Sequence, residues 1–386
     1  MAIETEQLQL AHIADWHDEL TALHARIAPR FGRPEVRLRV GRYLTGLLGP
    51  VERRNGWQLA EQSGERTPDG VQRLLRTARW DAEAVRDDLR AYVVEHFGDS
   101  NAVLVIDETG ILKQGTKSVG VARQYSGTAG RIANCQIGVF LAYASPLGRA
   151  FLDRALYLPK DWTADVTRRR EAGIPEDVAF ATKPALAQAM LGRAFAAGVP
   201  AGWVTGDSVY GNDSKLRFWL HDQQCPYVLA VTSAHRVWHG FGQRRVDELV
   251  AEVPAEDWER IMVGMGSKGP RVYDWALGQL PYETTAGFGQ WLLIRRSVSE
   301  PEEFTYYRVF APLTTTLETV ARVAATRWVI EEGFERAKGE VGLDQYEVRH
   351  WNAWYRHITL ALLAHAFLEV TRATANAGRQ KGANAT

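Results

Sequence analysis

The stretch VLVIDETG (residues 103–110) decides the fold class of this chain. Four aliphatic residues follow one another in it without alternation, which is typical of a strand buried on both faces of a sheet. The run ends on Asp107, and a carboxylate at the end of a buried strand is unfavourable unless a cation compensates its charge. The stretch therefore predicts a central strand of an α/β sheet, with a cation near Asp107.

A second stretch, GWVTGDSVYG (residues 202–211), repeats this arrangement. A short apolar run again ends on an aspartate, Asp207, which follows Gly206. Both aspartates are therefore expected at the carboxyl ends of strands in one sheet, the edge at which open α/β sheets bind their ligands. Gly206 has no Cβ and would allow a ligand or a neighbouring backbone to approach closely.

A third element is the helical stretch TRWVIEEGFERAKGEVGLDQ. Its Arg327, Glu331, Glu335 and Lys338 are four, four and three residues apart, so they share one helix face. Taken alone, such a pattern is usually an exposed face with salt-bridged pairs. Together with the two strand-end aspartates, however, a glutamate of this helix can complete a group of three converging carboxylates.

Converging carboxylates stay ionised only beside a compensating cation. Hard divalent ions such as Mg²⁺ prefer carboxylate oxygens and keep water ligands for a substrate phosphate. Two such ions, roughly 4 Å apart, stabilise the attacking and leaving oxygens of an in-line phosphoryl transfer. The sequence therefore predicts a metal ion as the cation that compensates Asp107.

The composition is that of an ordinary globular protein. The chain has 386 residues, enough for two or three domains, with 46% hydrophobic and 24% charged residues. Its net charge of zero neither indicates nor excludes a polyanionic partner, because local charge matters more than the sum. Its two cysteines, Cys135 and Cys225, cannot build a disulfide framework or a four-ligand zinc site, and they fit a reducing cytosol.

Neither a signal peptide nor a membrane segment is predicted. The N-terminus MAIETEQLQL lacks a basic region followed by an apolar one. The apolar segment ITLALLAHAFL has 11 residues, which is too short to span a bilayer and indicates a core helix. We therefore expect a soluble intracellular protein without a membrane partner.

Residues 1–98 are predicted to form a helical region with an excess of positive charge. Residues 26–79 hold twelve arginines and five acidic residues. Within this region, GWQLAEQSGERTPDGVQRLL has the pattern of two short helices and a tight turn, with Thr67 as N-cap and Pro68 as first helical residue. The second helix would present Arg73 and Arg76 outward, as in a helix-turn-helix that enters a DNA groove. The alternative is a plain helical hairpin with a solvated basic face.

The rest of the chain divides by pattern into four further parts. Residues 99–232 alternate strands and helices, which predicts a mixed α/β sheet flanked by helices. The expected strands are 102–107, 135–145, 150–158, 202–206 and 227–232, and the expected helices are 183–197 and about 213–223. Residues 233–312 are interpreted as a β-rich insertion, 313–375 as helices that carry Glu331, and 376–386 as a disordered tail.

The stretch that follows Asp107, GILKQGTKSVGVARQYSGTAGR, carries cations and no acidic residue. The cations are Lys113, Lys117, Arg123 and Arg131. Glycines with scattered cations suit a backbone that follows DNA phosphates, and an exposed hairpin loop is the alternative.

With these motifs in view, the chain resembles the DDE transposases of bacterial insertion sequences, in the group whose last motif reads Tyr-x2-Arg-x3-Glu-x6-Lys. Arg327, Glu331 and Lys338 match its spacing, and VIDETG and GDSVYG match its two aspartate strands. The resemblance implies a ribonuclease H-like core in which Asp107, Asp207 and Glu331 are catalytic. The same residues would be ligands of two Mg²⁺ ions, for which Mn²⁺ can substitute.

The resemblance covers residues from about 35 to 370. The 123 residues between Asp207 and Glu331 fit the β-rich insertion of the group. One departure is Ala324, which occupies the position of the motif's tyrosine, so a phosphate contact through that hydroxyl cannot occur here.

The activity implied by the resemblance is cut-and-paste transposition in the bacterial cytoplasm, at the nucleoid. The enzyme would hydrolyse double-stranded DNA at the ends of an insertion sequence, and the freed 3′ hydroxyl would attack target DNA. A homodimer is expected in the DNA complex, because two ends must be brought together. Arg327 and Lys338 suit phosphate binding, and Trp328 is either a base-stacking residue or a core tryptophan.

Two other functions remain open at this stage. A domesticated, non-mobile DNA-binding or regulatory protein could retain the same fold and the same carboxylates. A metal-dependent phosphohydrolase would also use strand-end aspartates. A haloacid-dehalogenase-like enzyme, however, requires Asp-x-Asp-x-Thr, whereas Glu108 and Thr109 follow Asp107 here, and it has no need of the arginine-rich N-terminal region.

Overall fold

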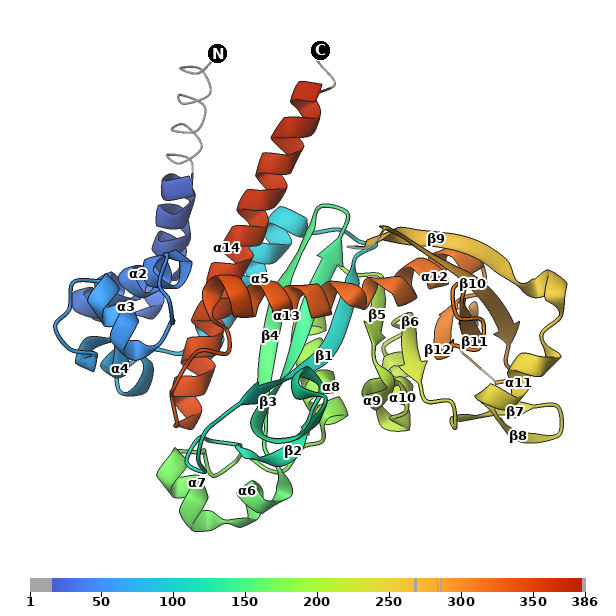
Figure 1. Ribbon diagram of the computed structural model, residues 1–386, viewed down its shortest axis with the longest axis horizontal. Coiled ribbons are helices and arrows are strands. Elements are labelled where there is room, and N and C mark those ends of the chain that lie inside the picture. Colours follow the sequence, from blue (N-terminus) through green and yellow to red (C-terminus); the bar gives the residue numbers. More distant parts are fainter. Residues whose placement is uncertain (1–15, 267–268, 283, 285, 384–386) are drawn as a thin grey trace.

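The computed structural model describes residues 16–266, 269–282, 284 and 286–383. Its centre is a mixed sheet with the strand order β2-β3-β1-β5-β6-β12-β11-β10-β9, in which β4 pairs with β3 outside this path (Figure 1). A separate ribbon consists of β7 and β8. The strands are β1 (Val103–Leu112), β2 (Ala122–Ser126), β3 (Arg131–Ser145), β4 (Gly148–Tyr157), β5 (Trp203–Gly206), β6 (Tyr227–Val231), β7 (Arg236–His239), β8 (Gly242–Arg245), β9 (Glu259–Gly266), β10 (Gly269–Gln279), β11 (Phe288–Ser297) and β12 (Phe304–Pro312).

Helices flank this sheet, which confirms the predicted fold class. Helix α13 packs on β1 and β4, α12 on β5 and β6, α8 on β3 and β4, and α5 and α14 on β4. The helices are α2 (Pro34–Leu48), α3 (Gly56–Gln62), α4 (Asp69–Arg76), α5 (Ala82–Phe97), α6 (Lys160–Ala164), α7 (Val166–Ala172), α8 (Lys183–Ala196), α9 (Ser208–Gly211), α10 (Ser214–Asp222), α11 (Val246–Leu249), α12 (Leu317–Thr326), α13 (Trp328–Val341) and α14 (Trp351–Ala383).

Strand β1 is the central strand that its sequence predicts, but it is longer than expected. Residues 103–106 are buried, and β1 pairs in parallel with β5 and antiparallel with β3. The parallel ladder ends at Ile106, whereas the antiparallel ladder continues from Asp107 to Leu112. The prediction that the strand ends at Asp107 is therefore wrong on the β3 side, because β3 continues to satisfy the backbone of β1.

The β-rich stretch at 233–312 continues the central sheet. Strand β12 pairs antiparallel with β6, and β11, β10 and β9 follow in order. Tyr307, Val309 and Phe310 of β12 are buried in the same core as β6. This burial explains why the strands extend the sheet, since the apolar side chains of β12 need cover that a separate small sheet would not supply.

The N-terminal helices show the predicted burial pattern with a shifted cap. Val71, Leu74 and Leu75 of α4 are buried, while Arg73 and Arg76 are exposed. Thr67 is not the N-cap, because its hydroxyl donates to the side chain of Asp69 (3.0 Å) and Pro68 precedes the helix. The equivalent role in α3 belongs to Asn55, whose side chain accepts hydrogen bonds from two backbone N–H groups.

The C-terminal end of α4 is docked on α14. The guanidinium of Arg356 donates to the carbonyl oxygens of Leu75 (3.2 Å) and Trp80 (2.8 Å). The amide of Asn352 donates to the carbonyl oxygen of Arg76 (2.8 Å). These bonds satisfy carbonyl groups that a helix end leaves free, and they fix the N-terminal helices to the core.

Helix α14 corrects the prediction of a tail at 376–386. The helix continues through Ala383, since the stretch contains helix formers such as Arg379, Gln380 and Lys381 and no proline, although Gly378 and Gly382 are weak helix formers. Residues 384–386 lie outside the described residues. Among the described residues, α14 also holds one segment, Trp351–Ala377, whose length and composition would allow it to cross a membrane. That is weak evidence for a membrane, since 67% of its most apolar window is buried inside the protein, as in a core helix.

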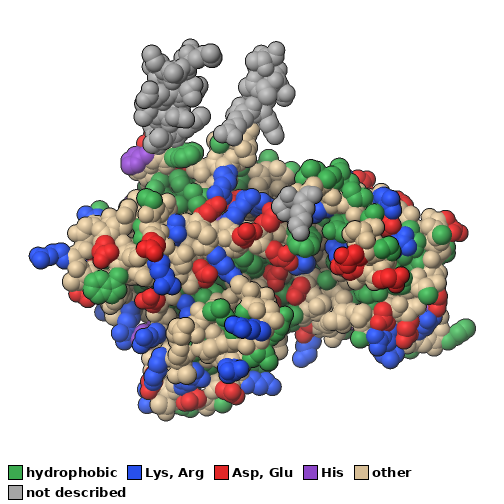
Figure 2. All heavy atoms as spheres, viewed as in Figure 1, with side chains coloured by type: hydrophobic (Ala, Val, Ile, Leu, Met, Phe, Trp, Pro, Cys, Tyr) green, Lys and Arg blue, Asp and Glu red, His purple; other side chains and the backbone are tan. Residues whose placement is uncertain are grey.

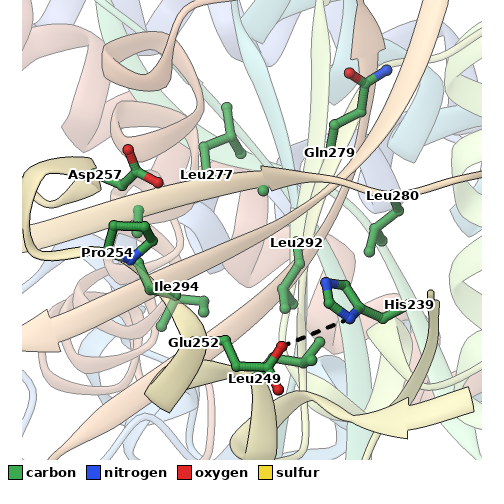
Figure 3. A pocket seen from close by; sticks show the side chains of 13 residues that line it. His239, Leu249, Glu252, Pro254, Asp257, Leu277, Gln279, Leu280, Leu292 and Ile294 are labelled. Carbon is green, nitrogen blue, oxygen red and sulfur yellow. Dashed lines mark ion pairs between the residues drawn. The ribbon is translucent and has the colours of Figure 1, made fainter.

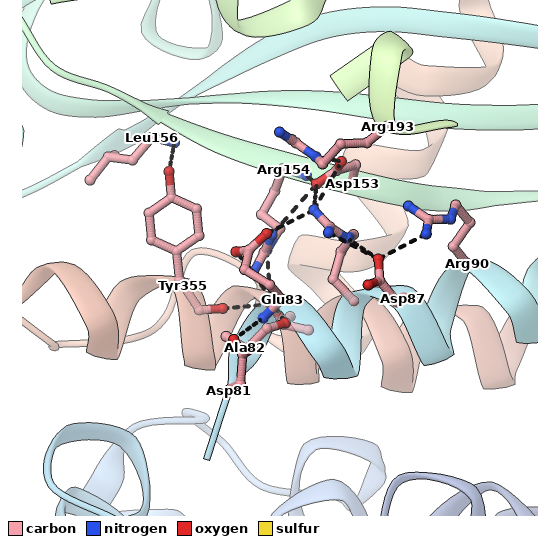
Figure 4. Close-up of polar contacts among 12 residues, drawn as sticks. Asp81, Ala82, Glu83, Asp87, Arg90, Asp153, Arg154, Leu156, Arg193 and Tyr355 are labelled. Atoms are coloured by element: carbon pink, nitrogen blue, oxygen red, sulfur yellow. Dashed lines mark hydrogen bonds and ion pairs between the residues drawn. The ribbon is translucent and has the colours of Figure 1, made fainter. Parts of the chain in front are cut away.

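A buried charge network joins α5, β4 and α8 (Figure 4). Asp153 is 2% exposed and forms ion pairs with Arg193 (2.9 Å), Arg86 (3.3 Å) and Arg154 (3.5 Å). Burial alone would raise the pKa of Asp153, but the charges of the three arginines outweigh it and lower this pKa. Asp153 therefore stays ionised as the shared partner of three cations.

Candidate active site

The two predicted aspartates lie beside each other at the end of the β1–β5 ladder. Ile106 and Gly206 form the last parallel pair, and Asp107 and Asp207 are the next residues of the two strands. Asp207 caps α9, and its Oδ1 accepts a hydrogen bond from the N–H of Val209 (2.9 Å). A Cβ at Gly206 would lie 3.3 Å from the carbonyl oxygen of Ile106, which is the close backbone approach that the glycine predicts.

The protein's own cations do not compensate these two carboxylates fully. Burial, the charge of Asp207 and the charge of Glu108 together raise the pKa of Asp107 to about 8. Burial and the charge of Glu108 raise the pKa of Asp207 as well. Arg327 opposes both effects but does not overcome them. Two half-buried carboxylates in this state are a donor set that fits a divalent cation.

Arg327 lies between Asp107 and the glutamate of the later helix. It occupies the junction of α12 and α13, and its Nη1 is 2.6 Å from Glu331 Oε1 and 3.7 Å from Asp107 Oδ2. Arg327 contacts both carboxylates, so Glu331 lies near the sheet edge that carries Asp107. Within the described residues, no three Asp, Glu, His or Cys side chains lie close enough together to hold a metal ion. The three-carboxylate site stays a prediction.

Lys338, the last residue of the motif, lies on the Asp107 face of β1. Its Nζ donates to the hydroxyl oxygens of Thr109 (2.7 Å) and Thr128 (3.2 Å). Thr109 is two residues from Asp107, so the two side chains point to the same face of the strand. Burial lowers the pKa of Lys338. Arg327, Glu331 and Lys338 therefore all face the edge that carries the aspartates.

Glu108 is a site residue that sequence reasoning missed. Its carboxylate accepts hydrogen bonds from Lys183 of α8 (2.6 Å) and from the hydroxyl of Tyr210 of α9 (2.5 Å). It also raises the pKa of both aspartates. The acidic doublet at 107–108 was visible in the sequence, but its partners are 75 and 102 residues away, so no local pattern identified them.

Glu332, the neighbour of Glu331, has a different environment. Its carboxylate pairs with Arg149 (2.7 Å) and Arg271 (3.2 Å), on β4 and β10. The guanidinium of Arg271 also lies 5.0 Å from the centre of the Trp328 ring. Trp328 is half-buried beside these cations, which leaves both its interpretations open. Glu332 thus joins α13 to the sheet, while Glu331 faces Arg327 and Asp107.

The four cations that follow Asp107 either contact other residues or lie on paired strands. Lys113 is held inside, where its Nζ donates to the carbonyl oxygen of Tyr346 (2.7 Å) and burial lowers its pKa to about 8. Lys117 pairs with the exposed Glu171 (2.9 Å). Arg123 and Arg131 are exposed on the paired strands β2 and β3. Figure 2 shows Lys and Arg side chains gathered over the end of the molecule formed by β2, α6 and α7.

A cavity of about 240 Å³ lies in the extension of the sheet, away from the aspartates (Figure 3). Leucine and isoleucine side chains line it together with His239 and Glu252, which approach to 3.9 Å. None of the predicted site residues lines this cavity. It is therefore separate from the candidate active site.

This geometry agrees with the comparisons to known proteins. Residues 26–249 match the family model of DDE superfamily endonucleases, and residues 181–367 match that of the transposase DDE domain. The chain therefore belongs to the DDE superfamily of endonucleases, as a protein of the DDE transposase type. It is 23% identical to a probable transposase for insertion sequence element IS701 from Microchaete diplosiphon, over 82% of this chain and 79% of the relative. The predicted family is confirmed, and the match favours it over the phosphohydrolase.

Proposed function

We propose that the chain is a DNA transposase that hydrolyses the phosphodiester bonds at the ends of an insertion sequence and joins the freed 3′ hydroxyl to target DNA. The chain belongs to the DDE family, and one structural observation supports the proposal most directly. Asp107 and Asp207 extend from adjacent parallel strands into one half-buried site, where burial and neighbouring carboxylates raise the pKa of both side chains. Two such carboxylates are suited to bind divalent cations.

In this proposal, Asp107, Asp207 and Glu331 hold two Mg²⁺ ions, which Mn²⁺ can replace. When bound, the ions supply Lewis acidity and a water of lowered pKa at neutral pH. The chain's own residues orient the carboxylates and the DNA. Arg327 holds Glu331 by its guanidinium, and Lys338 presents a point charge to a phosphate at the same edge. Two copies of the chain would act together, because transposition joins two DNA ends.

The direct test is cleavage of a DNA fragment that carries the element with its flanking ends. Mg²⁺-dependent cutting at the ends, abolished by EDTA and restored by excess Mg²⁺, is the expected result. Ends that are bound specifically but never cut would instead favour a domesticated DNA-binding protein. A protein that neither binds nor cuts the ends would contradict the transposase proposal.

DNA recognition through α4 leads to a separate prediction. Replacing Arg73 and Arg76 with Ala is expected to weaken DNA binding and to reduce the slope of log K against log salt by about two, since each phosphate contact contributes roughly one. Fluorescence anisotropy of a labelled end fragment over a range of salt concentrations measures both quantities. Arg322→Ala is the control, because Arg322 is also on a helix surface but pairs with Glu318 (2.7 Å). An unchanged slope in the α4 variant would exclude α4 from the interface.

A further inference from the structure

A cleft of about 490 Å³ lies between the N-terminal helices and the segment that joins α13 to α14. One wall is formed by Trp57 of α3 and by Gln72 and Arg76 of α4. The opposite wall is formed by residues 347–350, and the floor includes the hydrogen-bonded pair Tyr43 and His357. Its volume lies within the range of small-ligand sites, roughly 300–1,000 Å³.

We propose that this cleft binds an unpaired nucleotide of a DNA strand, with the base against Trp57 and the phosphates at Arg76 and Arg349. The proposal rests on the proposed function to the extent that DNA is the substrate. It adds a second DNA site, which is separate from the carboxylates.

The aromatic wall suits a base. The Trp57 side chain is large, apolar and 55% exposed. Proteins that bind single-stranded DNA use exposed aromatic rings of this kind as platforms on which bases stack. The bases of an intact duplex offer no free face, so the wall favours an unpaired nucleotide.

The cations of the cleft suit phosphates. Arg76 and Arg349 are exposed, and neither forms an ion pair with a carboxylate among the residues that the structure describes. Arg54 also lines the cleft, but its guanidinium donates to the carbonyl oxygen of Leu47 (2.8 Å), which gives it a structural role. Glu347 is the acidic residue of the lining, so the exposed arginines leave the cleft with an excess of positive charge.

The walls are fixed before any ligand arrives. The carbonyl groups of α4 are bound to α14, as described above, and the N–H of Arg54 donates to the side chain of Gln345 (2.8 Å). The backbone of Arg349 accepts a hydrogen bond from the N–H of Val119 (3.0 Å), which leaves its side chain available. A preformed site loses less free energy on binding than one that must order itself.

The cleft continues into a groove beside α6 and α7. This groove of about 590 Å³ shares Arg349 and His350 with the cleft, and it is lined by Lys117 and Arg168 as well as by the carboxylates of Asp165 and Glu171. Lys113, at the end of β1, supports the same segment through Tyr346. Lys113 is six positions after Asp107 along extended chain, or about 20 Å.

The test compares a fluorescein-labelled oligothymidylate of 12 nucleotides with a duplex of equal length, by anisotropy on the full chain. Trp57→Ala and Arg349→Ala are each expected to weaken single-strand binding at least fivefold and duplex binding less than twofold. Trp238→Ala is the matched control, because Trp238 is 46% exposed but lies on β7. Thermal denaturation shows whether each variant is folded.

Equal losses for single strand and duplex would overturn the proposal, since they indicate a general phosphate contact. Unchanged single-strand binding in both variants, or no binding by the wild type, would also overturn it. The cleavage assay separates this result from the proposed function. If the wild type binds the oligonucleotide through Trp57 but cuts no DNA end, the result supports nucleotide binding in the cleft and contradicts the transposase proposal.

Discussion

Glu331→Gln is expected to reduce metal-dependent cleavage of DNA ends by about 1,000-fold or more, while DNA affinity stays within about twofold of wild type. Such a loss corresponds to roughly 4 kcal/mol of transition-state stabilisation, comparable to what a bound metal ion supplies at a phosphoryl group. Glutamine keeps the volume of the side chain and removes its charge. The substitution should therefore remove the proposed metal ligand without creating a cavity. Single-turnover cleavage of a labelled end fragment measures the effect.

The neighbouring Glu332→Gln is the matched control. Glu332 contacts Arg149 and Arg271 and does not face the aspartates, so its loss should reduce cleavage less than tenfold. Equal losses of cleavage in both variants would show that Glu331 has been wrongly assigned as the glutamate of the motif. Because Glu331 also pairs with Arg327, the unfolding free energy of both variants should be measured alongside.

Asp153→Asn is expected to lower the free energy of unfolding by about 3–5 kcal/mol, which is the usual cost of leaving buried charge without its partner. Arg154 is fully buried and Arg86 nearly so, and neither can reach water when Asp153 loses its charge. Glu83 remains beside both arginines but is half exposed and cannot replace the lost carboxylate. The effect should appear as a lower midpoint in urea denaturation.

The control for this prediction is a pair at the surface. Glu318→Gln removes the partner of Arg322 on α12, where the two side chains are 61% and 58% exposed, and it should change stability by less than about 0.5 kcal/mol. A change below 1 kcal/mol in Asp153→Asn would mean that the network around Asp153 is hydrated and contributes little to the fold.

The sequence predicted those features of the site that depend on local order. An apolar run followed by an aspartate identified β1 and β5, and the parallel pairing then placed Asp107 beside Asp207. Helical spacing placed Arg327 next to Glu331, at 2.6 Å. The position of each residue within its strand or helix follows from local periodicity. The pairing of β1 with β5 was expected instead from the general rule that the carboxyl ends of strands meet at one edge of an α/β sheet.

Features that depend on distant partners could not be predicted in this way. The end of β1 was misplaced because its length is set by β3, and the β-rich stretch was separated from a sheet that it continues. Glu108 finds its cation 75 residues away in Lys183. Trp57 and Arg349 line the same cleft although they are far apart in the sequence, and nothing near either residue indicates the other.

The docking of α4 on α14 has a consequence for the newly made protein. The carbonyl groups at the end of α4 obtain their partners from Asn352 and Arg356, which are synthesised long after the N-terminal helices. Domains usually fold in the order in which they leave the ribosome, but the proposed DNA-binding surface of α4 gains these hydrogen bonds only when the last helix has been made. An aborted translation product that ends before α14 should therefore fail to occupy DNA ends. The cell would be spared an inactive competitor for the full-length protein.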